Sequence, residues 1–227
     1  MKKPFIALVA AATVFGTTAY GIPTLQLDAS NAAYDAATET TLASSPEFTL
    51  FALFNGLTPS GTYYISAALT PATPSGNYGS FKFNGTTVNV TSDMSWGTPT
   101  LLPSHDIFPT YYKEFAFTFS TSDNSNRFTN YDVQSVVGEH TGPIQSNTGN
   151  SRFAAFSIDL SGLAPETGIH FDLYNYSTKQ NGELKIKFAP FSHDAGGNNL
   201  VPDGGNTALL IGLGLVCLGL FKGRNAR

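Results

Sequence analysis

Short segments in which apolar and polar residues alternate are the feature that most limits how this chain can fold. Residues 169–174 (Ile-His-Phe-Asp-Leu-Tyr) alternate in this way, and residues 183–188 (Glu-Leu-Lys-Ile-Lys-Phe) repeat the pattern after a turn around Asn181 and Gly182. Side chains of a strand point alternately to its two faces, so this period of two predicts half-buried antiparallel strands. His170, Asp172 and Tyr174 are then expected on the face opposite the apolar residues.

Similar segments recur along most of the chain. Residues 47–54 carry apolar side chains on both faces, and 115–119 and 156–160 place large apolar residues on one face. Asn84-Gly85 separates two further segments, and this dipeptide is typical of the type I′ turn of a β-hairpin over 81–91. Roughly nine or ten such segments, with Pro, Gly and Asn turns between them, predict an all-β fold, specifically an antiparallel β-sandwich of jelly-roll type.

The amino terminus has the layout of a secretory signal peptide. Lys2 and Lys3 precede an apolar stretch over 5–15, and Ala19 and Gly21 are the small residues expected before a cleavage site. We therefore expect residues 1–21 to engage Sec-type export machinery and to be removed by signal peptidase.

The carboxyl terminus carries a second hydrophobic segment, over residues 207–221. As a helix it would be about 22 Å long, short of a bilayer core of about 30 Å unless it extends by a few residues at each end. Lys222, Arg224 and Arg227 follow it and predict a cytoplasmic end, because cations are enriched on that side of a membrane. The body would then lie outside the cell.

The residues that introduce this segment are Val201, Pro202, Asp203, Gly204 and Gly205. Together with the apolar run and the basic end, they resemble the PEP-CTERM class of bacterial sorting signals, in its VPDSG-CTERM variant, with Gly204 in place of Ser. The resemblance implies that an exosortase, a membrane-embedded cysteine transpeptidase, cuts near the motif and passes the protein to the cell surface or extracellular matrix. Residues 201–205 would be its substrate.

Between the two terminal segments lies a predicted β-domain over 22–195, followed by a Gly/Asn-rich linker over 196–200. Seven of the 12 basic residues and 15 of the 16 acidic residues fall within 22–200, so this body has a formal charge of −8. Nucleic acid needs a concentrated basic surface, which this composition does not favour. Cys217, the one cysteine, lies in the hydrophobic segment, so the body has no disulfide and no thiolate ligand.

A second resemblance covers most of the body. The body is similar to the choice-of-anchor surface proteins, type N. The segments that carry this similarity are 25–27, 34–40, 107–112, 169–174 and 188–195. Such domains occur joined to alternative C-terminal sorting signals. The resemblance implies no catalytic residue.

Two groups of residues are candidates for ligand binding. Asp123, Asn124 and Asn126 supply the oxygen ligands that calcium prefers, although the same residue types favour turns. Trp96, Tyr111 and Tyr112 could stack on sugars of an extracellular polysaccharide, although strands also favour these aromatic residues for packing.

The pairs His105-Asp106 and His193-Asp194 suit a metal, but neither has a second ligand at short spacing, which favours an interpretation as loop surface. No nucleophilic serine elbow is present and no carboxylate pair stands out, so we expect no enzymatic activity. The predicted function is that of an exported surface protein with a structural or interaction domain. Two alternatives remain open: a secreted carbohydrate-binding or carbohydrate-active module, and a single-pass membrane protein whose tail is retained.

Overall fold

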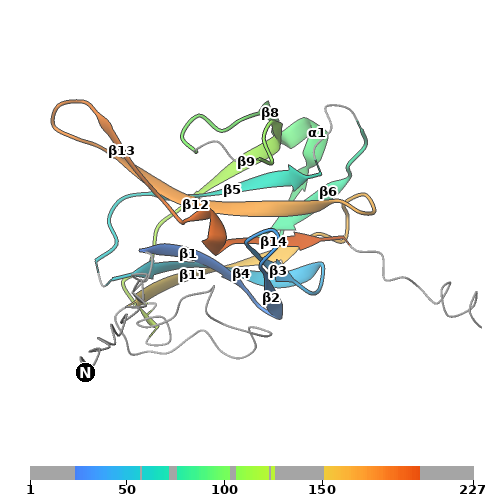
Figure 1. Cartoon of the computed structure of the whole chain (residues 1–227), viewed down its shortest axis with the longest axis horizontal. Helices are drawn as coiled ribbons and strands as arrows, with labels where there is room; N and C mark the ends of the chain where they lie inside the picture. The colour runs from blue at the N-terminus through green and yellow to red at the C-terminus, as the bar shows by residue number, and fades with distance from the viewer. Residues whose placement is uncertain are drawn as a thin grey trace, which may run out of the picture.

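The computed structural model describes residues 24–56, 58–71, 76–102, 106–122, 124–125 and 151–199. Their regular structure is almost entirely β and forms two sheets (Figure 1). The all-β prediction is therefore confirmed. The predicted signal peptide over 1–21 and the sorting segment over 201–227 lie outside the described residues. Within the described part of the chain, no helix is both long and apolar enough to cross a bilayer.

The first sheet contains six strands among the described residues, in the order β1-β4-β11-β6-β7, with β10 pairing β11. All of its pairs are antiparallel. Its strands are β1 (Leu25–Ala29), β4 (Glu47–Asn55), β6 (Ser80–Phe83), β7 (Thr86–Asn89), β10 (Asn124–Ser125) and β11 (Ser151–Asp159). β4 pairs with β1 on one side and β11 on the other, and, as its apolar residues on both faces predict, Leu50 and Leu53 are buried on opposite faces.

The predicted hairpin is present as β6 and β7. Asn84 and Gly85 have φ angles of 49° and 76°, the left-handed values that a type I′ turn requires. The second strand ends earlier than predicted, because Val90–Asp93 forms the short helix α1. The Asp93 carboxylate accepts a hydrogen bond from the backbone N–H of Asn89 at 2.8 Å, which holds this turn closed.

The second sheet contains eight strands among the described residues, in the order β2-β3-β14-β12-β5-β9-β8, with β13 pairing β12. Its strands are β2 (Ala32–Asp35), β3 (Thr40–Ala43), β5 (Tyr63–Thr70), β8 (Ser95–Gly97), β9 (Thr110–Phe117), β12 (Gly168–Thr178), β13 (Leu184–Phe188) and β14 (Asp194–Asn198). The prediction of purely antiparallel pairing is wrong at one place, since β14 and β3 are parallel. These strands are far apart in the chain, so no tight turn dictates an antiparallel arrangement.

The two sheets share one hydrophobic core. Phe48 of the first sheet meets Phe171 of the second edge to face, with ring centroids 6.3 Å apart, and Phe83 stacks on Phe115 at 3.9 Å. The apolar residues of β12 face this core, as their alternation predicts. The prediction of a half-buried strand is wrong for its first half, where the residues on the other face are buried too.

The predicted linker over 196–200 is also wrong. Residues 194–198 form β14, which lies between β12 and β3, and Gly196 and Gly197 are buried. A Cβ atom on Gly197 would lie 2.7 Å from the ring of Phe48, so glycine is needed here for close packing. Asn199 then donates a backbone hydrogen bond to Thr167 at 2.8 Å. The folded body therefore continues past the predicted boundary at residue 195, up to Asn199.

Candidate functional site

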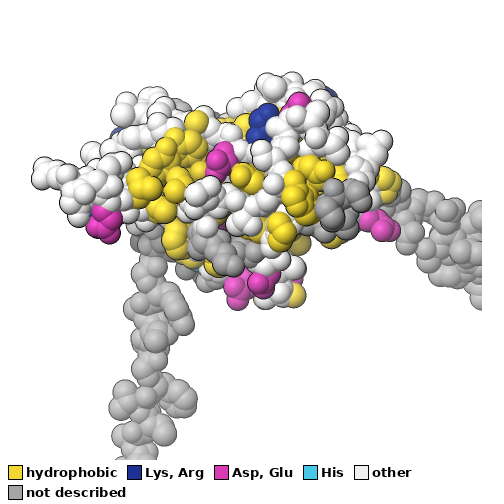
Figure 2. Space-filling model, turned by 90° about the horizontal axis from the view of Figure 1, so that it is seen from above, with side chains coloured by type: hydrophobic (Ala, Val, Ile, Leu, Met, Phe, Trp, Pro, Cys, Tyr) yellow, Lys and Arg dark blue, Asp and Glu magenta, His cyan; other side chains and the backbone are white. Residues whose placement is uncertain are grey.

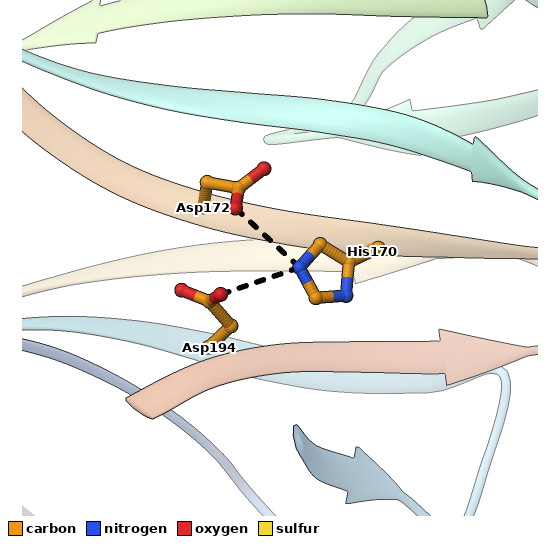
Figure 3. A group of neighbouring side chains, drawn as sticks. All are labelled: His170, Asp172 and Asp194. Carbon is orange, nitrogen blue, oxygen red and sulfur yellow. Dashed lines mark ion pairs between the residues drawn. The ribbon is translucent and has the colours of Figure 1, made fainter. Parts of the chain in front are cut away.

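The first half of β12 carries buried polar side chains on the face away from the hydrophobic core. His170 and Asp172 alternate with core residues on this strand, and β14 contributes Asp194 beside them (Figure 3). The register pairs Phe171 with Ala195, so the neighbouring residues Asp172 and Asp194 extend to the same face. The exposed fractions of the three side chains are 9% for His170, 5% for Asp172 and 1% for Asp194. We call these three residues the His-Asp cluster.

The two carboxylates of the cluster approach the same ring nitrogen (Figure 3). His170 Nε2 lies 3.5 Å from Asp172 Oδ1 and 3.4 Å from Asp194 Oδ2. Both distances exceed the 2.7–2.9 Å that is usual for a charge-assisted N–H···O hydrogen bond. The second carboxylate oxygen of Asp172, Oδ2, is buried and has no hydrogen-bond partner among the described residues. One atom from each residue forms a group whose members all lie within 4.8 Å of one another, a spacing that suits a metal ion.

The protein environment shifts the pKa of His170 strongly. Burial by itself lowers this pKa, but the contacts of the ring with Asp172 and Asp194 outweigh burial and raise it from 6.5 to about 10. With no cation present, the imidazole is therefore held in its charged form between the two carboxylates. The cluster favours positive charge at its centre.

A pocket of about 460 Å³ borders the cluster. Its walls come from β3, from the loop residue Ile107 and from Gly196 and Gly197 of β14, and His170 reaches it from β12. Asp172 and Asp194 do not line this pocket, so the cluster is approached from it through the imidazole. Apolar atoms make up most of the lining surface, although threonines also line it, and Glu166 is the acidic residue of the lining.

The second half of β12 carries tyrosines on the same face as the cluster. The ring of Tyr64 stacks between Tyr174 and Tyr176, with centroid distances of 5.2 and 5.4 Å. The hydroxyl of Tyr174 donates a short hydrogen bond to Glu114 on β9. Burial first, and then this hydrogen bond, raise the pKa of Tyr174 well above its ordinary value of 10.0.

Beyond the tyrosines, the paired strand β13 exposes apolar side chains. The register places Leu184, Ile186 and Phe188 opposite Thr178, Tyr176 and Tyr174, and therefore on one face. Leu184 is 47% exposed and Phe188 is 46% exposed, so the prediction of a half-buried strand is wrong for β13, where most residues are exposed. We call Leu184, Ile186 and Phe188 the hairpin stripe. Figure 2 shows hydrophobic side chains gathered on the face seen from above, including a group on the side toward which the β12–β13 hairpin projects in Figure 1.

The structure separates the three predicted stacking residues. Trp96 of β8 is 40% exposed and lies directly opposite Tyr111 of β9, and their rings meet edge to face at 5.1 Å. Tyr112 points to the other face of the strand, where it packs edge to face against Phe108 at 6.3 Å. Trp96 and Tyr111 are thus brought together, and Tyr112 is not.

Most residues of the other predicted sites lie outside the described part of the chain. Of the calcium candidates, Asp123 and Asn126 lie outside the described residues, and Asn124 is described only as a backbone position of β10 paired with Arg152. The motif residues Val201, Pro202, Asp203, Gly204 and Gly205, and the cations Lys222, Arg224 and Arg227, also lie outside the described part.

The pair His193-Asp194 is not loop surface. His193 is buried in the short 3-10 helix η3 (Phe191–His193), where its Nδ1 lies 2.9 Å from the Ser192 hydroxyl, and Asp194 belongs to the His-Asp cluster. His105 lies outside the described residues. Sequence reasoning did not identify His170 and Asp172 as a candidate site, although their alternation predicts that they share a face. Their meeting with Asp194 depends on the strand order.

Comparison with protein-family models, with curated proteins and with solved structures finds no match for this chain.

Proposed function

We propose that this chain is an exported protein of the cell surface or extracellular matrix, with a non-catalytic interaction domain held through its C-terminal segment. We further propose that the two sheets form a jelly-roll-like β-sandwich and that 207–221 forms the hydrophobic helix of a sorting signal. Export machinery, signal peptidase and an exosortase-like enzyme are the expected processing partners.

The observation that best supports this proposal is that the last strand of the body, β14, comes directly before the predicted sorting segment. β14 is hydrogen-bonded to β12 on one side and to β3 on the other, and only Leu200 separates Asn199 from the motif at Val201. Tension applied through the tail would therefore act on a strand inside a sheet. This connection suits a domain that is anchored at its C-terminus.

The hairpin stripe supports an interaction role. Large contiguous apolar patches on soluble proteins often mark interaction sites, and here Phe188 of the stripe also stacks on the partly exposed Phe191 at 6.3 Å. The hairpin projects from the body in Figure 1, which leaves the stripe accessible to a partner.

Processing is tested by mass spectrometry of the mature protein in surface and membrane fractions of a host that contains the sorting enzyme. We expect an amino terminus at Ile22 and loss of the peptide that ends at Arg227. The variant Asp203→Asn should retain the tail and accumulate in the membrane fraction, whereas the control Asp106→Asn, at an exposed position of the body, should be processed normally. An intact Arg227 in wild-type surface material would instead support the unprocessed single-pass alternative.

The interaction role is tested by replacing Leu184 and Phe188 together with serine. We expect this variant to keep its fold by circular dichroism but to bind less to matrix material prepared from the same cells. Lys185→Ser with Lys187→Ser is the matched control on the opposite face of the same strand. Equal binding by wild-type and stripe-substituted protein would remove the stripe from the proposal.

A carbohydrate-binding module is the second candidate, favoured by the exposure of Trp96 beside Tyr111. If this site binds sugars, Trp96→Ala should abolish signals on a glycan array, and Phe191→Ala, at another exposed aromatic position, should not. The absence of any glycan signal with wild-type protein would eliminate this candidate.

A further inference from the structure

We propose that His170, Asp172 and Asp194 form a binding site for a divalent transition-metal ion of the zinc type, which ties β14 to β12. The ion would stabilise the fold, because it would bridge two strands of one sheet.

The two distances from His170 Nε2 to the carboxylates match those between neighbouring ligand atoms of a metal ion. Zinc bonds to imidazole nitrogen and carboxylate oxygen are about 2.0–2.2 Å long, which places neighbouring ligand atoms of a tetrahedral site about 3.3–3.6 Å apart. The distances from His170 Nε2 to the two carboxylate oxygens are 3.5 and 3.4 Å. A direct N–H···O contact would bring these atoms closer, whereas an ion between them requires this separation.

The state of Asp172 is a second, independent observation. Within the part of the chain that the structure describes, its Oδ2 atom is buried without a hydrogen-bond partner, and leaving a buried carboxylate oxygen unsatisfied is costly. Coordination of the carboxylate by a cation would compensate for this loss. Two carboxylates and a neutral imidazole carry a charge of −2, which a divalent cation cancels.

The ligand types decide between metals. Calcium takes six to eight oxygen ligands and rarely uses imidazole, whereas one nitrogen and two carboxylate oxygens suit zinc and similar ions. Three protein ligands leave a fourth position, for water or for a second carboxylate oxygen. The neighbouring pocket reaches the cluster at His170.

The arrangement of the ligands in the chain indicates what the ion would do. His170 and Asp172 belong to β12, and Asp194 is the first residue of β14, directly after η3. β14 pairs with β12 over only four residues, Gly168 to Phe171. An ion held by all three ligands would extend this connection to the start of β14, at the end of the strand remote from the tail.

The test uses the full chain, purified in detergent without chelators and without a histidine tag. Metal content measured by mass spectrometry should be about one zinc per chain, and cobalt(II) added after chelator treatment should give the intense visible absorption of a tetrahedral site. Asp194→Asn and Asp172→Asn should each weaken cobalt binding at least tenfold. His193→Gln, which changes a buried histidine outside the cluster, should bind like wild type.

Two outcomes would overturn the inference. One is wild-type protein that takes up neither zinc nor cobalt, with no rise in its thermal midpoint when either ion is added. The other is a folded Asp194→Asn protein that binds cobalt as tightly as wild type. If the aspartate variants do not fold, X-ray absorption of the wild-type cobalt complex decides, because a site without a mixed nitrogen and oxygen ligand set contradicts the proposal.

Discussion

The surroundings of β12 depart at both ends from the usual rule that polar side chains lie outside and apolar ones inside. In the first half, His170 and Asp172 are buried beside Asp194 of β14. In the second half, the partner strand β13 exposes Leu184 and Phe188. One strand thus borders a buried charged cluster at one end and an exposed apolar stripe at the other.

This difference separates side chains that the stability of the fold depends on from side chains that contribute little to it. Burying charged groups is costly unless they are paired or bound to a cation. The charges of His170 and Asp172 in the first half of β12 must therefore be compensated by groups packed beside them. Leu184 and Phe188 of β13 are largely exposed and contribute little to folding, which is why we propose that they contact a partner. The following changes in stability are ordered from the largest expected effect to the smallest.

Asp194→Ala should produce the largest loss of stability. Removing one carboxylate leaves the other members of the cluster buried without their compensating charge, which typically costs about 3–5 kcal/mol of unfolding free energy. Urea denaturation, followed by the fluorescence of the single tryptophan, measures the change. Leu184→Ser on the hairpin stripe should change the same quantity by no more than about 0.5 kcal/mol. Equal losses for the two variants would contradict the contrast between the halves.

Gly197→Ala should have the second largest effect. The added Cβ would lie 2.7 Å from the Phe48 ring and 3.0 Å from Leu160, and overpacking of this kind costs about 1–3 kcal/mol. Gly196→Ala is the matched control, because its nearest neighbour would be 3.2 Å away. Thermal unfolding of both variants measures the difference. If neither substitution lowered the midpoint of thermal unfolding, residues 196 and 197 would behave as part of the linker that their composition predicts.

The positions of Gly196 and Gly197 in β14 also show which features of the fold the sequence alone does not predict. Alternation and turn residues predict an all-β fold, the hairpin around Asn84 and the two faces of β12, because these depend on neighbours in the chain. Glycine, by contrast, is depleted in strands, and only the packing of Gly197 against Phe48 and Leu160 explains its place in β14. The cluster was missed for the same reason, since β14 pairs with β12 through the overall topology.

Tyr174→Phe should have a smaller effect that depends on pH. At neutral pH it removes one hydrogen bond to Glu114, worth about 0.5–1.5 kcal/mol. Because burial and Glu114 raise the pKa of Tyr174 in the folded protein, the unfolded chain loses this proton more readily, and stability falls as the pH rises above about 10. The variant should lose stability less steeply in this alkaline range.

Chemical denaturation at a series of alkaline pH values measures this slope. Burial also raises the pKa of Tyr63, so part of the slope should remain in the variant. Identical slopes for the wild-type and variant proteins would contradict the assignment of the effect to Tyr174.

Asp159→Asn should have the smallest effect, because its ion pair is on the surface and not within the cluster. Lys82 Nζ lies 2.7 Å from Asp159 Oδ2, and its side chain is 52% exposed. The hydrogen bond from Lys82, with further ones from Ser161, lowers the pKa of Asp159 from 3.8 to about 2. Its contribution to stability is therefore present above pH 3.8 and is lost as the pH falls through about 2. Unfolding midpoints of the two proteins should differ slightly at neutral pH, converge toward about pH 2, and differ less in high salt, since salt screens exposed charges.

The loss of stability caused by Asp194→Ala should persist in high salt, because buried charges are screened much less than exposed ones. If high salt abolished this loss, Asp194 would be in contact with solvent, which would contradict the contrast with Asp159.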